Sequence, residues 1–461
     1  MNTQGHRIAI LGGGVAGLHV ASRLASRFRV TLIDREPAHV WKPMLHRIAA
    51  GTCAVLPPQT SYVAQARERG FVFVPGSVIG IDRRARQVQI APLVDGTLGE
   101  VVGARVLDYD TLVLALGSLA DGFRTPGVAE HCRTIDSRAQ AMAFNHEMRL
   151  RVLDAAAHRG LLSIGIVGGG ATGVELAAEL AQLADLAEYC GADGIAGRVR
   201  VTLLEGGPRI LRPLPERIAR ESHARLEELG VTVLTDARVE RASDLGLHLA
   251  DGRIIEPDIG IWAVGMRAPD VLGTLKVTCG GGGQVVVSDR LRSLDAPEIF
   301  ALGDCASLTP GSGRLPLAPT AQVAYQQACY LCRHLPALID GDEVPPFRFR
   351  EPDALVSVGG YGEFGSLGTF SFFRSAGIRG RIAHMAHVLL YRSHLVQLHG
   401  VWRGTLMWAV DLLNSRQPKI WLDRGRFRGP RQKAPPEAMA PLMPAKSLSA
   451  SAEMKVTAWH K

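Results

Sequence analysis

The stretch RIAILGGGVAGLHVASRL, residues 7–24, decides the fold, because an apolar run passes through a glycine-rich turn into a helical pattern. Gly12 can make the tight turn, Gly14 lets the backbone approach a pyrophosphate, and Gly17 lets the helix pack against the strand. The helix start offers backbone N–H groups without intrahelical partners and the positive end of the helix dipole. The stretch therefore predicts a strand, a phosphate-binding turn and a helix.

The segment VTLID, residues 30–34, supplies the next expected strand and ends in Asp34. A carboxylate at this strand end accepts a hydrogen bond from a ribose hydroxyl. Gly13 and Ala16 belong to the same turn and helix start, and we expect them to contact the bound dinucleotide. The order of strand, turn, helix, strand and acid is typical of a Rossmann-like dinucleotide-binding unit.

A second unit of the same kind follows in LSIGIVGGGATGVELAAELA, residues 162–181, with Gly168, Gly170 and Gly173 at the same spacing. Its acid is Glu205, at the end of the segment RVTLLEGG. A single glycine fingerprint is a weak signal, whereas two complete units indicate that one chain binds two dinucleotides.

Glu205 also predicts which nucleotide the second unit prefers. A carboxylate at this position accepts a hydrogen bond from a ribose 2′-OH but repels a 2′-phosphate, which favours NAD(H) over NADP(H). Arg209 is close enough in sequence to weaken that preference.

Three further segments run from an expected strand into a glycine, at residues 109–118, 257–269 and 297–307. The expected cofactor contacts in them are Ala115, Gly117, Gly265, Gly303 and Asp304. A carboxylate at position 304 could reach a ribityl hydroxyl of a flavin. An enzyme that holds both NADH and FAD can pass a hydride between them. We therefore expect the flavin in the first unit, with the second unit inserted into it.

The segment PLAPTAQVAYQQACYLCRHL, residues 316–335, predicts a loop followed by a helix that starts at Thr320. Gln322 and Gln326 are four residues apart and share one helix face, whereas Gln327 lies on another side. Buried amides need hydrogen-bonding partners. Because this helix follows the returning segment 297–307, we expect its positive N-terminal end to face the flavin.

The length of 461 residues favours two or three domains. The net charge of +8, with a pI near 9.3, favours an anionic partner such as nucleic acid, a membrane surface or a phosphorylated ligand.

Seven scattered cysteines do not indicate a disulfide framework. Cys329 and Cys332 read as packing residues of a helix, and no metal site is expected. Without a signal-peptide pattern or an apolar run of about 18–20 residues, a cytosolic or peripheral protein is expected.

Residues 372–428 contain ten Arg or Lys but only two Asp, and RIAHMAHVLLYRSHLVQLHG at 381–400 has a helical period. Basic residues together with tryptophans favour a helix that lies in the plane of lipid headgroups. The same apolar stripe could instead form a dimer interface. Residues 429–461 are rich in Pro, Ala, Ser and Lys, which predicts a flexible tail.

Together these motifs resemble the two-dinucleotide-binding flavoproteins. The segment AQVAYQQ at 321–327 and the C-terminal region are similar to the type II NADH:quinone oxidoreductases, the single-subunit, non-pumping alternative NADH dehydrogenases, and resemble their bacterial members. The resemblance implies an α/β fold of two Rossmann-like dinucleotide-binding domains, the FAD domain interrupted by the NAD domain, plus a C-terminal helical membrane-associating region. The expected boundaries are 1–125 and 285–345 for FAD, 126–284 for NADH, 346–428 for membrane association or dimerisation, and 429–461 for the tail.

The resemblance also implies cofactor contacts. It places the adenosine half of FAD on the first glycine-rich turn and Asp34, the ribityl chain on Asp304, and NADH on the second turn and Glu205. Ala321 and Gln322 are expected at the isoalloxazine ring.

It further implies three catalytic residues. Gln322 and Gln326 are expected to border a quinone pocket, and Glu175 to lie near the nicotinamide, where it either delivers protons or orients the nucleotide. The implied partners are ubiquinone or menaquinone and the cytoplasmic face of the cell membrane, with a homodimer possible.

Two alternatives remain open. A sulfide:quinone oxidoreductase shares the fold but needs a reactive cysteine pair near the flavin, and the matching region WKPMLHRIAAGTC holds only Cys53. A nucleic-acid-associated flavoprotein would explain the basic pI and predicts salt-sensitive DNA binding. The leading hypothesis expects no nucleic-acid partner.

Overall fold

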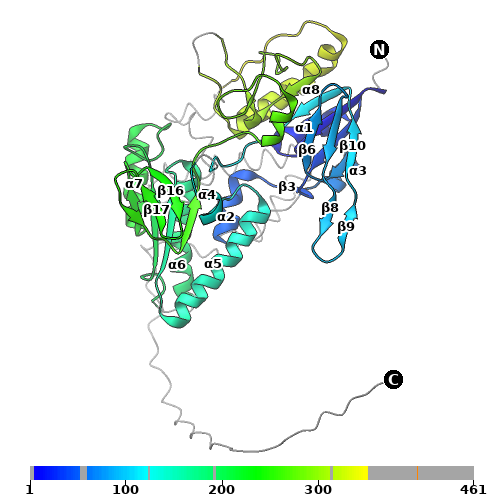
Figure 1. Ribbon diagram of the computed structural model, residues 1–461. Helices are drawn as coiled ribbons and strands as arrows, with labels where there is room; N and C mark the ends of the chain where they lie inside the picture. Colours follow the sequence, from blue (N-terminus) through cyan, green and yellow to red (C-terminus); the bar gives the residue numbers. More distant parts are fainter. Residues whose placement is uncertain are drawn as a thin grey trace, which may run out of the picture. The chain divides into compact units, whose positions relative to one another are not determined.

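The first sheet of the computed structural model, which contains the dark-blue strand near the N-terminus in Figure 1, has five parallel strands in the order β21-β11-β1-β2-β5. The structure describes residues 5–51, 60–122, 125–189, 194–311, 315–350 and 402. The strands are β1 (Arg7–Leu11), β2 (Arg29–Asp34), β5 (Val72–Pro75), β11 (Thr111–Leu114) and β21 (Ile299–Ala301). Because β21 pairs with β11, a segment from late in the chain completes the sheet that the N-terminus begins.

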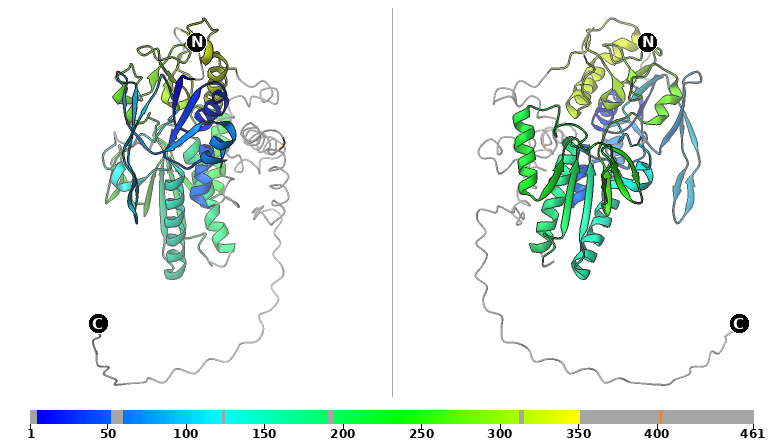
Figure 2. Two further views of the ribbon diagram at one scale, coloured as in Figure 1. Left: turned by 90° about the vertical axis from the view of Figure 1, so that its right-hand side faces the viewer. Right: turned by 60° about the vertical axis from the view of Figure 1, so that its left-hand side comes forward.

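Two helices that are far apart in the sequence cover this sheet. They are α1 (Val15–Leu24) and α8 (Ala321–Asp340), and Figure 2 shows the yellow α8 beside the blue α1. The residues from Ile8 to Leu11 are all buried, as expected for a parallel strand that is covered on both faces. Leu18 of α1 and Leu331 of α8 belong to the same hydrophobic cluster.

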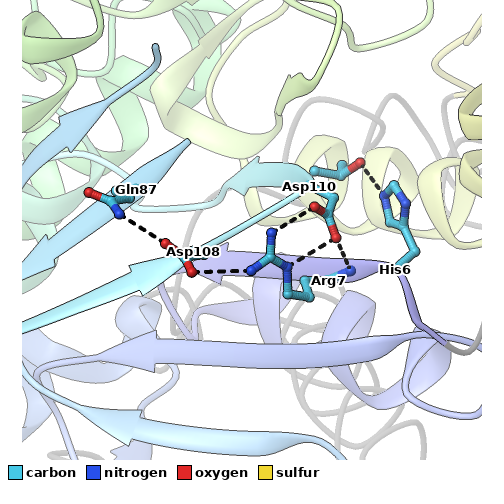
Figure 3. Close-up of polar contacts among 6 residues, drawn as sticks. His6, Arg7, Gln87, Asp108 and Asp110 are labelled. Carbon is cyan, nitrogen blue, oxygen red and sulfur yellow. Dashed lines mark hydrogen bonds and ion pairs between the residues drawn. The ribbon is translucent and has the colours of Figure 1, made fainter. Parts of the chain in front are cut away.

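A smaller antiparallel sheet, β10-β7-β6, adjoins the first sheet. Its strands are β6 (Val78–Asp82), β7 (Gln87–Ile90) and β10 (Arg105–Asp108). Arg7 at the start of β1 holds the two sheets together, because its guanidinium donates to Asp108 at 3.2 Å and to Asp110 at 2.9 Å (Figure 3). The hydrogen bond from the Arg7 side chain lowers the pKa of Asp110 to about 2.

The second large sheet is also parallel, in the order β12-β19-β13-β14-β15. Its strands are β12 (Cys132–Arg133), β13 (Leu162–Val167), β14 (Val199–Leu204), β15 (Val231–Leu234) and β19 (Ile259–Trp262). The accompanying helices are α4 (Val128–His131), α5 (Arg138–His158), α6 (Ala171–Tyr189) and α7 (Glu216–Glu228). An antiparallel sheet of β16 (Val239–Ser243), β17 (Gly246–Leu249) and β18 (Ile254–Ile255) belongs to this unit. The two parallel-sheet Rossmann-like units that the sequence predicts are thus confirmed.

Short elements connect and edge these sheets. The strands are β3 (Ala38–His39), β4 (Thr60–Ser61), β8 (Leu93–Asp95), β9 (Gly99–Val102), β20 (Val285–Val286) and β22 (Ala306–Ser307). The helical ones are η2 (Lys42–Met44), α2 (Leu45–Ala50), α3 (Tyr62–Arg69), η3 (Asp270–Leu275) and η4 (Gly303–Cys305).

Helix α2 packs away from the unit to which its sequence position assigns it. Leu45 and Ile48 belong to the hydrophobic cluster of the second unit, where α2 contacts α5 and α6 (Figure 1). The amide of Asn145 on α5 donates to the carbonyl of Ala49 at 3.2 Å. A helix from the first part of the chain therefore forms part of the second unit's core.

Helix η3, which lies within the expected NADH domain of 126–284, packs on the first unit. Leu272 and Leu275 of η3 belong to the hydrophobic cluster of the first unit. The backbone N–H of Ile81 on β6 donates to the hydroxyl of Thr274 at 3.1 Å. Apolar side chains of η3 are buried against β6, and this burial fixes where the chain crosses over.

Within the described ranges, no helix is long and apolar enough to cross a bilayer. The expectations for the tail at 429–461, and for all of 346–428 except residues 346–350 and 402, lie outside the described residues.

Candidate functional site

The first glycine-rich turn joins β1 to α1 and has the geometry that its glycines predict. Gly12 has φ 97°, a conformation that side chains with a Cβ rarely adopt, and a Cβ there would overlap the Ala115 carbonyl. A Cβ on Gly17 would overlap the Gly12 carbonyl. Close packing of turn, helix and strand therefore requires glycine at both positions.

Gly14 differs, because a Cβ there would meet no protein atom within 4 Å. Gly14 is the N-cap of α1, no side chain caps that end, and no acidic residue lies in the first turn. The N–H groups at the start of α1, which include that of Ala16, thus face open space at a positive dipole end. This cradle fits the pyrophosphate of a dinucleotide such as FAD.

Gly13 is held by three side chains. Its N–H donates to Asp34 Oδ2 at 2.5 Å, and its carbonyl accepts from the Tyr62 hydroxyl at 2.7 Å. The Nδ1 atom of His39 lies 3.0 Å from the same carbonyl. Burial raises the pKa of Asp34, against the lowering effect of hydrogen bonds from the N–H groups of Gly13 and Glu36. Asp34 thus links the turn to the end of β2, where the sequence predicts the ribose contact.

The second turn, between β13 and α6, repeats this construction. Gly168 has φ 116°, and a Cβ on Gly173 would overlap the Gly168 carbonyl, whereas a Cβ on Gly170 would meet nothing within 4 Å. Glu205 Oε2 accepts from the Gly169 N–H at 2.8 Å, as Asp34 does in the first unit. No acidic residue lies in the first turn of α6. A second dinucleotide therefore fits the second turn as well.

The Arg209 side chain is hydrogen-bonded to backbone carbonyls beyond this turn. Its guanidinium donates to the carbonyl of Leu211 at 3.1 Å and to that of Arg212 at 2.7 Å. These two hydrogen bonds hold the arginine in the loop that follows β14. They do not leave it as a freely placed partner for a 2′-phosphate, so the weakening of NAD(H) preference considered from sequence gains no support here.

Around β11 and η4, loops from distant parts of the first unit meet. Gly117 and Gly303 both have positive φ, at 68° and 70°. The Ser118 hydroxyl donates to Asp304 Oδ2 at 2.9 Å, and Lys42 Nζ donates to the Ser118 carbonyl at 2.8 Å. Asp304 is thereby fixed beside the carboxyl ends of the parallel strands, where open α/β sheets bind ligands.

Gly265 follows β19, the strand of the second unit, at the return to the first unit. It has φ 71°, and a Cβ there would lie 2.8 Å from Asp121 Cβ. Nearby, the backbones of Leu119 and Arg267 exchange two hydrogen bonds of 2.9 Å. The two connecting segments between the units are therefore paired with each other at this position.

Helix α8 begins at Ala321, with the Thr320 hydroxyl accepting from the Val323 N–H at 3.2 Å. The capping residue is thus the one at which the sequence analysis expects the helix to start. Gln322, in the first turn, is half-buried. Among the residues that the structure describes, its amide has no hydrogen-bond partner. Ala321 and Gln322 are the α8 residues that a ligand at this helix end would meet first.

The other two glutamines of α8 already have partners. The Gln326 amide donates to the Arg350 carbonyl at 2.7 Å and accepts from the Arg350 N–H at 3.0 Å. Gln327 is buried, and its Oε1 accepts from the Gly303 N–H at 2.7 Å. The quinone-site role of Gln326 stays a prediction, and its amide is engaged with backbone. Gln327, which the sequence analysis leaves without a role, positions the loop that carries Asp304.

Glu175 lies in α6 and faces α2. Its Oε2 is 3.3 Å from His46 Nδ1, and both side chains are buried. One helical turn on, Glu179 Oε1 lies 3.6 Å from Arg47 Nε. Burial, followed by repulsion from Glu179, raises the pKa of Glu175 well above its usual value, and Arg47 opposes this rise. A carboxyl in this environment can hold a proton at neutral pH.

Sequence reasoning misses His46, Arg47, Tyr62, Lys42 and Gln327. None belongs to a spacing motif, and each acts through a partner more than twenty residues away. The only available signal is the presence of polar side chains within otherwise apolar helical segments, which does not identify a partner.

The cysteines of α8 pack against α1. Cys329 Sγ lies 3.7 Å from His19 Nε2, and Cys332 Sγ lies 4.0 Å from the His19 carbonyl. Burial lowers the pKa of His19 to about 4 and raises that of Cys332 to about 12, so neither carries charge at neutral pH. In the described part of the chain, no group of three or more His, Cys, Asp or Glu residues is arranged to hold a metal ion.

Comparison with known proteins gives consistent results. Residues 6–328 match the family described as pyridine nucleotide-disulphide oxidoreductase. A protein of Haemophilus influenzae named type II NADH:quinone oxidoreductase is 35% identical over 432 residues, which cover 88% of this chain and 97% of that protein. A type II NADH:quinone oxidoreductase of Mycobacterium tuberculosis is 27% identical over 441 residues, 90% of either chain.

Among solved structures, NDH2 of Plasmodium falciparum in complex with NADH superposes with a TM-score of 0.67. The superposition covers 75% of this chain and 87% of that one at 18% sequence identity. At this level of identity, the likeness shows a shared fold.

Proposed function

The chain belongs to the pyridine nucleotide-disulphide oxidoreductase family and to the type II NADH:quinone oxidoreductases, and we therefore propose that each of its two glycine-rich turns binds one of two cofactors. The protein is an NADH:quinone oxidoreductase that uses FAD. When bound, FAD accepts a hydride from NADH and passes two electrons to the quinone. The observation that carries the assignment is the duplicated cradle, in which the same open helix start is joined to an acid at the end of the next strand.

In this proposal, FAD lies on the first turn and NADH on the second. Asp34 accepts from the adenosine ribose of FAD and Asp304 from the ribityl chain, while Glu205 accepts from the ribose of NADH. Support for this assignment comes from the return of β21 and α8 to the first unit, where β21 pairs with β11 and α8 packs on α1, the helix that begins at the first cradle.

The central test follows the spectrum of the purified flavoprotein. NADH should bleach the flavin absorbance faster than NADPH does, and a short-chain quinone should restore it. Absence of bleaching by either nucleotide would contradict the assignment of the second turn. Bleaching without recovery by quinone would contradict the identity of the electron acceptor.

We assign Glu175 to proton supply at the quinone. Quinone reduction consumes two electrons and two protons, and NADH brings only one proton with its electron pair. A buried carboxyl whose pKa is raised can hold the second. The alternative is that Glu175 only orients the nicotinamide. The variant E175Q distinguishes the two roles, because the loss should fall on the quinone step while flavin bleaching by NADH continues. If only bleaching slows, the orienting role is correct.

Membrane association at the cytoplasmic face is proposed for the basic segment at 372–428. Quinones are lipid-soluble and must be reached from the bilayer, and Trp402 in this segment is exposed. Each basic residue near an anionic leaflet contributes on the order of 1 kcal/mol. The protein should sediment with anionic liposomes and be released by high salt. NADH oxidation at such vesicles should move no protons across the bilayer, since the proposed function includes no proton pumping.

A homodimer through the apolar stripe of 381–400 is the competing use of that segment. Light scattering with and without liposomes separates the two. A dimer that persists at all concentrations and does not bind liposomes would favour the interface between copies.

A further inference from the structure

Helix α2 packs on α6 (Figure 1), and four ionisable side chains meet at this contact. His46 and Arg47 are consecutive on α2, and Glu175 and Glu179 are one turn apart on α6. His46 pairs with Glu175, and Arg47 pairs with Glu179. The exposed fractions of the His46 and Glu175 side chains are 4% and 11%. The proposed function uses only Glu175 of this set.

The charges of this set balance only when it holds one mobile proton. Glu179 and Arg47 cancel each other, which leaves Glu175 and His46. If both are deprotonated, the buried cluster carries an uncompensated negative charge, which is costly in a low-dielectric interior. If the pair holds one proton, it is neutral with the proton on the carboxyl, or an ion pair with the proton on the imidazole.

The geometry allows the proton to occupy either site. With 3.3 Å between Glu175 Oε2 and His46 Nδ1, a protonated carboxyl can donate to the ring nitrogen, or a protonated ring can donate to the carboxylate. Within the described ranges, the charged groups that act on Glu175 are Glu179 from α6 and Arg47 from α2 itself. From α5, the neutral amide of Asn145 donates to the carbonyl of Ala49 near the end of α2. From η2, Lys42 donates to the Ser118 carbonyl.

We propose that His46 is a positioning residue that shares one proton with Glu175 and so sets the pH range over which the quinone is protonated. The inference rests on the proposed role of Glu175. The net reaction, NADH + H⁺ + quinone → NAD⁺ + quinol, takes one proton from solution per turnover. Glu175 gives up that proton to the quinone. When the pair takes up a new proton from solution, His46 can hold it as an imidazolium, which stabilises the neighbouring Glu175 carboxylate.

The His46–Glu175 pair also connects segments of the two units. Helix α2 belongs by sequence to the part of the chain that carries Asp34, and α6 begins at the second cradle. The proton pair therefore lies at the contact of a segment from each half, and its formation requires that α2 be packed in the second unit.

Infrared spectroscopy of the flavoprotein tests the pairing without turnover. The resting protein should show a band of a protonated carboxylic acid that is absent in E175Q. Replacing His46 removes the group that can become a cation beside Glu175. In H46Q the band should therefore persist to a higher pH than in the wild type, by about 1 pH unit or more. H46N provides a second variant with the same loss of charge if H46Q does not fold.

The matched control is H19Q, which changes another buried histidine, between α1 and α8. It should leave the pH at which the band fades unchanged. The pH dependence of the rate of quinone reduction should likewise shift in H46Q and stay unchanged in H19Q. An unchanged band and an unchanged pH profile in H46Q would overturn the role of His46.

Failure of the proposed proton role of Glu175 gives a different result. If E175Q reduces quinone at the wild-type rate, Glu175 supplies no proton, and both proposals fall together. If E175Q blocks the quinone step while H46Q behaves as the wild type in the band and the rate profile, only the inference about His46 is wrong.

Discussion

Replacing Gly170 by alanine should weaken nucleotide binding without destabilising the protein. A Cβ at this position would meet no protein atom within 4 Å, and Gly170 lies outside the left-handed region of backbone conformation. The methyl group would project into the space in front of the α6 N-terminus, which the pyrophosphate of the nucleotide must enter to reach the free N–H groups. Gly173→Ala is the matched control, because its Cβ would instead overlap the Gly168 carbonyl inside the protein.

The two variants differ in the size and the kind of their effects. Loss of one charge-assisted hydrogen bond costs about 1.5–3 kcal/mol, which corresponds to a roughly 10- to 150-fold weaker affinity. For Gly170→Ala, the free energy of unfolding should change by less than about 1 kcal/mol, since the new methyl group contacts nothing. For Gly173→Ala, the overlap should cost roughly 3 kcal/mol of stability.

The assay measures NAD⁺ affinity by calorimetry and stability by urea unfolding without nucleotide. NAD⁺ is used because it binds without reducing the flavin. Wild-type NAD⁺ affinity in Gly170→Ala would refute the placement of the nucleotide phosphates on the α6 N-terminus. A large loss of stability in that variant would refute the geometry that leaves this position open.

Three further changes test other parts of the site. Gln322→Leu should slow flavin reoxidation by quinone more than bleaching by NADH, and an equal effect on both half-reactions would make this amide structural. Gln327→Leu should leave the Gly303 N–H without its acceptor, which costs about 1–3 kcal/mol in urea unfolding and should speed the release of FAD on dilution. Asp110→Asn should cost about 1 kcal/mol at pH 7, discounted from about 2.4 kcal/mol because Arg7 is partly exposed. The Asp110 pKa is about 2 in the folded protein, below its unfolded value, so this loss should shrink as pH falls from about 4 toward about 2, which urea unfolding at pH 7 and pH 3 can follow.

The cradles and their acids could be found from the sequence because their chemistry depends on local spacing. A turn that brings backbone N–H groups to a phosphate needs glycines at fixed positions, and the acid follows at the end of the next strand. Gly12, Gly170 and Glu205 accordingly lie at the positions that the motifs predict. The start of α8 beside Thr320 is equally local, since a threonine that caps a helix acts within its own first turn.

The partners of the polar side chains depended on packing between distant segments, which spacing does not encode. Gln326 and Gln327 are neighbours in sequence, yet one pairs with the Arg350 backbone and the other with Gly303. A rotation of one residue along a helix changes the facing direction by about 100°, so the register of α8 against its surroundings assigns each amide.

The sequence by itself determined the two nucleotide cradles, because local backbone geometry limits which residues can form them. Only the tertiary structure decided that α2 packs in the second unit and brings His46 to Glu175. The physical reason is that apolar burial is non-directional: Leu45 and Ile48 could be covered by either core, and the choice between them fixes which buried charges meet.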